Sequence, residues 1–251
     1  QRDRRPLRKA WPKVESLKGA DFEPLSYQAT VFTSGNELIV SRVMSSFYPR
    51  VSDRFDADPT VLPPLPAGAP KEVPRILLAS ETGEWRLEVA TSRVNLHWHR
   101  QSESRIEVSS FFKVATDLLL AYIQESEGSI LRLAGLVNRF ARMVHPGLYL
   151  ARHFCKETWL QQPLNRPESF ELHSHKRFQL ADGFNVNSWA RSKTGFVGAD
   201  KTAIVLFEQD INTVANDSDV ESYSEDQVSR FYAAVAQEVD IILDLYFPNV
   251  A

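Results

Sequence analysis

Two pairs of histidines stand one residue apart, in His97-Trp98-His99 and His173-Ser174-His175. Alternate residues of an extended strand project to one face, so the two imidazoles of each pair could chelate one metal ion. A metal site needs three or four converging ligands, and the spacing places no cysteine or carboxylate beside either pair. We therefore assign no metal ligand and no cofactor, and keep a metal-dependent hydrolase built on the His-x-His pairs as an alternative.

Nucleophilic catalysis would need an activated cysteine or serine. Cys155 has His153 and His145 near it in the sequence, but the apolar helical spacing around it predicts a small buried residue. The sequence contains no Gly-x-Ser-x-Gly elbow, phosphate loop, dinucleotide-binding glycine fingerprint or His-Glu-x-x-His helix. No catalytic residue is assigned, and the absence of enzymatic activity is favoured.

Two strand-like segments alternate polar with apolar residues, which predicts strands with one buried and one polar face. The polar positions are Arg93, Asn95, His97 and His99 in the first segment, and Asn185, Asn187, Trp189 and Arg191 in the second. The exposed face of a curved sheet can bind a peptide, a nucleic-acid strand or a small ligand. These residues are the candidate binding positions, with a merely solvated sheet face as the alternative.

The first 21 residues are predicted to form a basic N-terminal arm. Its candidate nucleic-acid contacts are Arg2, Arg4, Arg5, Arg8 and Lys9. Such an arm could tether phosphate or an acidic partner, or it could be a solvated tail. Nucleic-acid association through the arm and the strand arginines Arg93, Arg139, Arg142 and Arg191 is a second functional hypothesis. The net charge of −3 argues against a nucleic-acid-binding surface over the whole protein.

The composition is that of an ordinary folded protein, with 43% hydrophobic and 24% charged residues in 251. No run of about 18 apolar residues occurs, so we expect no membrane-spanning segment. The lone Cys155 cannot form an internal disulfide, which is typical of a reducing compartment, and we expect a cytoplasmic protein.

Residues 22–127 are predicted to form the first of two α+β halves. The expected elements are a strand at 26–32, a short helix at 39–47 ended by Pro49, a proline-rich loop at 49–74, a meander of three strands at 75–80, 85–89 and 94–98, and a long helix. The Ser104-to-Glu107 spacing is that of a capping box, which would open the long helix.

Residues 128–251 repeat that order as the second half. The expected elements are a strand at 129–141, a helix from Pro146, strands at 170–180, 184–191 and 203–214, and a long helix opened by a capping box at Ser224–Gln227. Asp182-Gly183 predicts the turn between the first two of those three strands. The predicted fold is α+β, with two similar halves that each pack an antiparallel sheet on a long helix and form one globular unit. Ordinary alternation of strands and helices is the alternative to an internal duplication.

Three stretches resemble an uncharacterised, sporadically distributed prokaryotic protein family of similar length. They are Pro74–Ser80 continuing through Trp85 to Trp98, Leu136–Phe140, and Phe207–Ile211 followed by the C-terminal helix. Where that family typically carries Gly-Leu-Arg-Tyr-x-Asn, this chain has Ala134-Gly135-Leu136-Val137-Asn138 and matches at Asn138. The likeness covers roughly residues 22 to 247 and implies the same order of elements, but no activity, cofactor or site residue.

The leading functional hypothesis is a non-enzymatic binding or regulatory protein that acts through its polar sheet faces within a multi-protein system. A protein partner is expected, nucleic acid is the alternative partner, and the sequence leaves the oligomeric state open.

Overall fold

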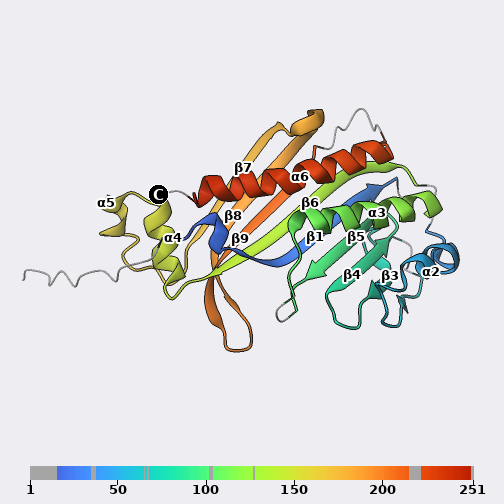
Figure 1. The fold of residues 1–251 in the computed structure, drawn as a ribbon, viewed down its shortest axis with the longest axis horizontal. Helices are drawn as coiled ribbons and strands as arrows, with labels where there is room; N and C mark the ends of the chain where they lie inside the picture. Colours follow the sequence, from blue (N-terminus) through green and yellow to red (C-terminus); the bar gives the residue numbers. More distant parts are fainter. Residues whose placement is uncertain are drawn as a thin grey trace, which may run out of the picture.

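The strands form one curved antiparallel sheet, and the two long helices lie across the same side of it (Figure 1). The structure is a computed structural model, and it describes residues 16–34, 38–64, 66, 68–101, 104–126, 128–214 and 222–249. The α+β class predicted from the sequence is confirmed.

The N-terminal part of the chain supplies five strands and the first long helix. Its elements are a 3-10 turn η1 (Gly19–Asp21), β1 (Glu23–Thr33), α1 (Val40–Arg42), a π-helical turn η2 (Val43–Phe47), α2 (Tyr48–Val51), β2 (Thr60–Val61), β3 (Pro74–Ala79), β4 (Trp85–Ala90), β5 (Arg93–His99) and α3 (Val108–Ser126).

The C-terminal part supplies four strands and the second long helix. Its elements are β6 (Ile130–Arg142), α4 (Pro146–Phe154), α5 (Glu157–Leu160), β7 (Glu171–Gln179), a 3-10 turn η3 (Ala181–Gly183), β8 (Asn185–Val197), β9 (Thr202–Thr213) and α6 (Glu225–Tyr246). Asp182 and Gly183 both have positive φ, as a tight turn requires, and they connect β7 to β8 as expected.

The expectation of two sheets is wrong, because the strands from both parts join in a single sheet. Its order is β2-β3-β4-β5-β1-β6-β9-β8-β7, and every neighbouring pair is antiparallel. The junction is the long pairing of β1 with β6, in which Tyr27 stands opposite Val137 and Ala29 opposite Gly135. On each side of this central pair, the next strands follow in reverse order of the sequence: β5, β4, β3 beside β1, and β9, β8, β7 beside β6. A structural duplication of the halves stays a prediction.

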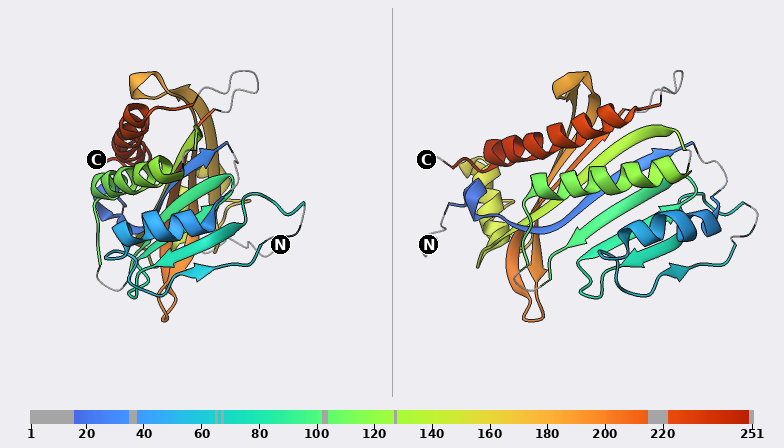
Figure 2. Two further views of the ribbon diagram at one scale, coloured as in Figure 1. Left: turned by 90° about the vertical axis from the view of Figure 1, so that its right-hand side faces the viewer. Right: turned by 45° about the vertical axis from the view of Figure 1, so that its right-hand side comes forward.

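One face of the sheet carries the hydrophobic core beneath the helices. Tyr27 of β1 stacks on Trp98 of β5 at 5.2 Å and packs against Phe111 of α3, which places alternate residues of these strands in the core. Figure 2 shows the sheet nearly edge-on in its left panel, with α3 and α6 on the same side. We call the opposite side the open face, because none of the described helices covers it. None of the helices in the described ranges is both long and apolar enough to cross a membrane.

Two expected helix boundaries are wrong for identifiable reasons. The first helix does not end at Pro49: the π-helical turn ends at Phe47, and the chain continues without a break into α2, which contains Pro49. The first long helix, α3, begins at Val108 rather than at Ser104. The Tyr27 hydroxyl donates a 3.3 Å hydrogen bond to the carbonyl oxygen of Ile106, a tertiary contact within the segment that leads into the helix. The capping box at Ser224–Gln227 is confirmed, with both reciprocal hydrogen bonds present.

Candidate binding face

The two predicted polar strand faces belong to one surface, the open face. In β5, the core side takes Val94, Leu96 and Trp98, so the alternating polar residues point away from the helices. In β8, Val186 and Ala190 are in the core, which likewise sends the alternating polar residues to the open face. Three strands separate β5 from β8 in the sheet, so the two sets lie about 19 Å apart at roughly 4.8 Å per strand.

A row of directly opposed residues runs across seven strands of the open face. We call it the cross-strand row; from β4 to β7 its members are Glu88, Asn95, Thr30, Ala134, Asn212, Asn187 and Arg177. Six of the seven are polar or charged, and Ala134 on the central strand β6 separates two hydrogen-bonded groups. The row connects the candidate residues of the two parts of the chain.

The first group runs from β1 to β4. Gln28 donates to the Thr30 hydroxyl at 2.9 Å, Thr30 donates to the Asn95 side-chain oxygen at 2.9 Å, and the Asn95 amide donates to Glu88 at 3.2 Å. Arg86 forms an ion pair with the same Glu88 carboxylate at 2.7 Å. Each polar group thereby fixes the orientation of the next, so the Arg86 guanidinium is held at the sheet surface.

The second group lies on β6 to β7 and centres on Asn212. The side-chain oxygen of Asn212 accepts from Arg132 at 2.5 Å and from Asn187 at 3.3 Å, while its amide donates to Asp210 at 3.0 Å. Arg177 donates to the side-chain oxygen of Asn187 at 3.0 Å. The amide side chains therefore hold two arginines, one on a central strand and one on the edge strand β7.

An aromatic and basic cluster lies beside the second group. The rings of His175 and Trp189 stack with centroids 4.2 Å apart and planes at 16°. The Arg191 guanidinium carbon lies 5.4 Å from the Trp189 ring centroid, and Arg191 also forms an ion pair with Glu208. Trp and Arg are enriched at the energetically dominant positions of protein interfaces.

The candidate polar residues differ in exposure more than the sequence indicates. Asn95 is buried, with 4% of its surface exposed, because the side chains around it cover it and it has partners on both sides. His99 and Asn185 are exposed, and the remaining candidates are half-buried. Asn95 is therefore a supporting residue, and the His97 side chain is largely covered as well, at 16% exposed; the arginines, His99 and Trp189 form the accessible surface.

The His-x-His pairs lie on the open face, as alternation predicts, but they do not gather into a metal-binding cluster. No group of three or more His, Cys, Asp or Glu within the described ranges is arranged to hold a metal ion. Burial is the main reason that the pKa of His97 lies below its usual value, and Glu88, 3.5 Å away, opposes that shift. His173 forms its ion pair with Glu171 at 2.6 Å.

Other sequence candidates lie elsewhere or stay outside the described residues. Arg139 faces the helices rather than the open face: it is 6% exposed and forms an ion pair with Asp240 of α6. Cys155 is half-buried at the end of α4, not fully buried, and the nearby His153 ring hydrogen-bonds the Tyr246 carbonyl at 2.6 Å. The arm residues Arg2, Arg4, Arg5, Arg8 and Lys9 lie outside the described part of the chain.

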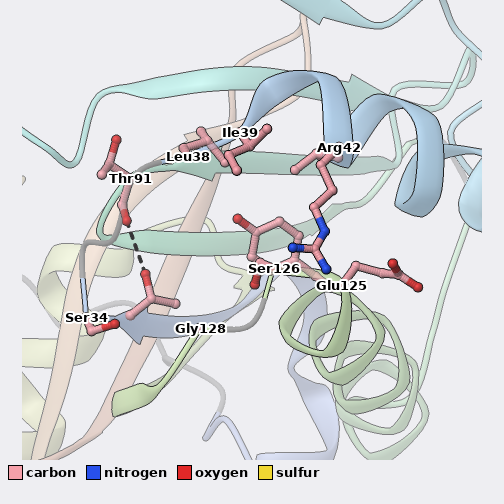
Figure 3. A pocket seen from close by; sticks show the side chains of 11 residues that line it. Ser34, Leu38, Ile39, Arg42, Thr91, Glu125, Ser126 and Gly128 are labelled. Atoms are coloured by element: carbon pink, nitrogen blue, oxygen red, sulfur yellow. Dashed lines mark hydrogen bonds between the residues drawn. The ribbon is translucent and has the colours of Figure 1, made fainter.

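The structure contains hollows away from the open face. Figure 3 shows a small cavity of about 50 Å³ between the segment leading into α1 and the end of α3, beside the hydrogen bond from Thr33 to the Thr91 carbonyl. A wider hollow of about 940 Å³ lies beside α4 and the β8–β9 hairpin, where Val144 and Phe196 are 82% and 72% exposed. Neither hollow includes any of the predicted site residues.

The sequence does not predict a group of arginines that gathers at one end of the open face, and of its members it points only to Arg142. Arg100, Arg105 and Arg142 all bind the carboxylate of Glu23, at 2.6, 3.0 and 2.6 Å. These residues come from β1, β6 and the segment after β5, so no spacing along the chain brings them together. A scan against protein-family models finds no match for the chain, and a search of curated proteins finds no similar sequence.

Proposed function

We propose that this chain is a non-enzymatic binding or regulatory protein whose open face contacts a protein partner within a larger assembly. The observation that supports this most strongly is the cross-strand row, which unites the polar residues of β5 and β8 on one helix-free surface. Arg132 and Arg177 are held by amide side chains, and Trp189 is held by stacking with His175, so these residues lose little conformational freedom on binding, which favours association.

The mixture of charges on the open face favours a protein over nucleic acid. Glu88 on β4 and Glu208 and Asp210 on β9 lie on the same open face as the arginines, and they would repel a polyanion that crossed the sheet. A protein surface can present both signs of charge and match such a pattern. The proposed partner surface is therefore polar and mixed in charge.

The half-exposed and exposed side chains of the open face allow a direct test. We would use the full chain as bait in extracts of its native cells, and compare wild type with the double variant Arg177→Ala/Trp189→Ala. The matched control is Lys113→Ala/Gln237→Ala, which removes exposed side chains from α3 and α6 on the opposite side.

The proposal predicts a protein that wild type and the helix-layer control recover equally, and that the open-face variant loses. Binding of the same purified protein should weaken by about tenfold or more in the open-face variant, the loss typical of one or two interface anchors. A partner whose affinity falls only in the helix-layer control would contradict the proposal.

We also propose that the two halves of the chain arose by duplication of one ancestral half. Its support is the strand order, which proceeds β1, β5, β4, β3 on one side of the central pair and β6, β9, β8, β7 on the other. An ancestral half would then have paired with a second copy through the strand that became β1 and β6, and each copy would have contributed one polar strand to the open face.

A further inference from the structure

The arginine cluster around Glu23 has a composition unlike the rest of the open face. Glu23 begins β1, Arg142 ends β6, and Arg100 and Arg105 follow β5. Glu23 stands opposite Phe140 in the β1–β6 pairing, and Phe140 and Arg142 alternate with core residues of β6, so the cluster lies at one end of the open face.

One carboxylate is shared among three guanidinium groups. Arg100 and Arg105 bind one oxygen of Glu23 at 2.6 and 3.0 Å, and Arg142 binds the other oxygen at 2.6 Å. A carboxylate offers about four acceptor positions, whereas the two exposed guanidinium groups, those of Arg105 and Arg142, carry about ten N–H donors. The donors of these two arginines therefore exceed what Glu23 can accept.

The cluster has a buried base and an accessible rim. The Arg100 side chain is 8% exposed, and its guanidinium carbon lies 5.4 Å from the Phe140 ring centroid. Arg142 lies 5.3 Å from the same ring, but its side chain is 56% exposed, and that of Arg105 is 59% exposed. Glu23 and Phe140 thus hold in place two arginines whose side chains are open to solvent.

We propose that Arg105 and Arg142, supported by Arg100 and Glu23, bind the phosphate group of a phosphate monoester. Phosphate has more acceptor oxygens than a carboxylate, and guanidinium groups recognise it through paired hydrogen bonds. A monoester fits better than a polymer of phosphodiesters because the cluster is compact and carboxylates lie beyond it across the sheet. This site has its own chemistry, so it does not depend on the protein partner proposed above.

Electrostatics within the cluster agree with an excess of positive charge. Burial alone raises the pKa of the Glu23 carboxyl, but the hydrogen bond from Arg100 and the charges of Arg100, Arg142 and Arg105 outweigh it and hold that pKa below its usual value. The Asp200 carboxylate is fully exposed, and its pKa is lowered first by a hydrogen bond from Thr202 and also by the charge of Arg142. Asp200 therefore places a negative charge within electrostatic range of Arg142.

Titration calorimetry of the full chain with phenyl phosphate, inorganic phosphate and dimethyl phosphate tests the proposal. We expect phenyl phosphate and inorganic phosphate to bind, and the diester dimethyl phosphate to bind at least about tenfold more weakly, since it has one negative charge fewer. Arg105→Ala/Arg142→Ala should weaken phenyl phosphate binding by about tenfold or more. The lysine pair Arg105→Lys/Arg142→Lys should retain part of it, because lysine keeps the charge but lacks the planar fork.

Two controls make the result specific to this cluster. Arg230→Ala removes an arginine of α6 that pairs with Asp226, and it should leave phenyl phosphate binding unchanged. Asp200→Asn should strengthen binding by a few-fold at low salt, because it removes that negative charge. Absence of phosphate binding at millimolar concentration, equal loss in Arg230→Ala, or tight binding of an oligothymidylate without any binding of phenyl phosphate would overturn the proposal.

Discussion

The hydroxyl of Tyr232 on α6 donates a 2.9 Å hydrogen bond to the carbonyl oxygen of Thr30 on β1. Tyr232 is fully buried, and Thr30 contributes its own hydroxyl to the cross-strand row on the other side of the sheet. A helix from the end of the chain is thereby attached to the strand near its beginning. The position of the open-face network therefore depends on packing in the helix layer.

Tyr232→Phe should lower the free energy of unfolding by about 1–2 kcal/mol, because the ring packing is retained and one buried hydrogen bond is lost. Urea-induced unfolding measures this change. Tyr246→Phe is the matched control: its hydroxyl bonds Ser174, an exposed residue, so the loss should be smaller. Equal stabilities of wild type and Tyr232→Phe would show that the hydrogen bond contributes nothing.

Gly135 of β6 allows the helix layer to approach the sheet closely. A methyl group there would lie 2.9 Å from Val235 and 3.0 Å from Phe112, and both side chains are buried. Gly135→Ala should therefore cost about 1–3 kcal/mol of stability. Gly195→Ala is the control, because its nearest contact would be an ordinary 3.5 Å from Ile204, and it should change stability by less than about 0.5 kcal/mol. A larger loss in the control than in Gly135→Ala would contradict this packing.

His97 should make stability depend on pH in the neutral range. Burial is the first cause that lowers its pKa in the folded protein below the ordinary 6.5; the charges of His99 and Arg86 add to that effect, and Glu88 opposes it. Below pH 6.5, His97 is protonated in the unfolded chain but stays neutral in the folded chain. The contribution of His97 to the free energy of unfolding is therefore fully present above pH 6.5, and it is lost as the pH falls toward the folded-state pKa.

We expect the unfolding free energy of wild type to fall between about pH 7.5 and about pH 5.5, and to fall less steeply in His97→Gln. The pKa of His99 is lowered as well, mainly by burial, so the slope should decrease without vanishing in the single variant. Stability that rises on acidification over this range, in wild type but not in His97→Gln, would contradict the burial of a neutral His97.

Asn212 should control the order of two arginines on the open face. It is 7% exposed and accepts hydrogen bonds from Arg132 and Asn187, so Asn212→Ala leaves both donors without that acceptor. We expect a stability loss of about 1–3 kcal/mol. NMR relaxation of the arginine side-chain N–H groups should show greater motion of the Arg132 Nη and the Arg177 guanidinium in the variant, while the Arg132 Nε–H keeps its 3.1 Å hydrogen bond to the Thr213 carbonyl. Unchanged order of Arg132 would mean that the amide does not position it.

The sequence predicts local structure better than strand pairing. Alternation of apolar and polar residues identifies which side of β5 and β8 is buried, because side-chain direction follows from the strand backbone. The same pattern does not show which strands pair with each other, so it is equally compatible with two separate sheets and with one sheet. The pairing of β1 with β6 closes a loop of nearly a hundred residues, from Thr33 to Ile130, which no local signal encodes.

The sequence predicts the strand residues of the candidate site, but it does not predict the contacts that support them. His97, Trp189 and Arg191 lie on the open face because strand alternation places them there. The sequence does not point to Asn212, Arg100 or Arg105, and it points to Arg142 only as a possible nucleic-acid contact, because these residues meet their partners only when distant segments fold. Arg139 is predicted as a surface arginine, but it alternates along β6 with the residues of the open face. Its side chain therefore points toward α6, where it pairs with Asp240.

Site-specific photo-cross-linking in the native cells tests most directly whether the open face is the binding surface. The photoreactive amino acid p-benzoylphenylalanine would replace Arg177 of the cross-strand row in one variant and Lys113 of α3 in the other, both of which are exposed. We predict a discrete cross-linked protein from position 177 and none from position 113. Cross-links to one protein from position 113, with none from position 177, would contradict a partner on the open face.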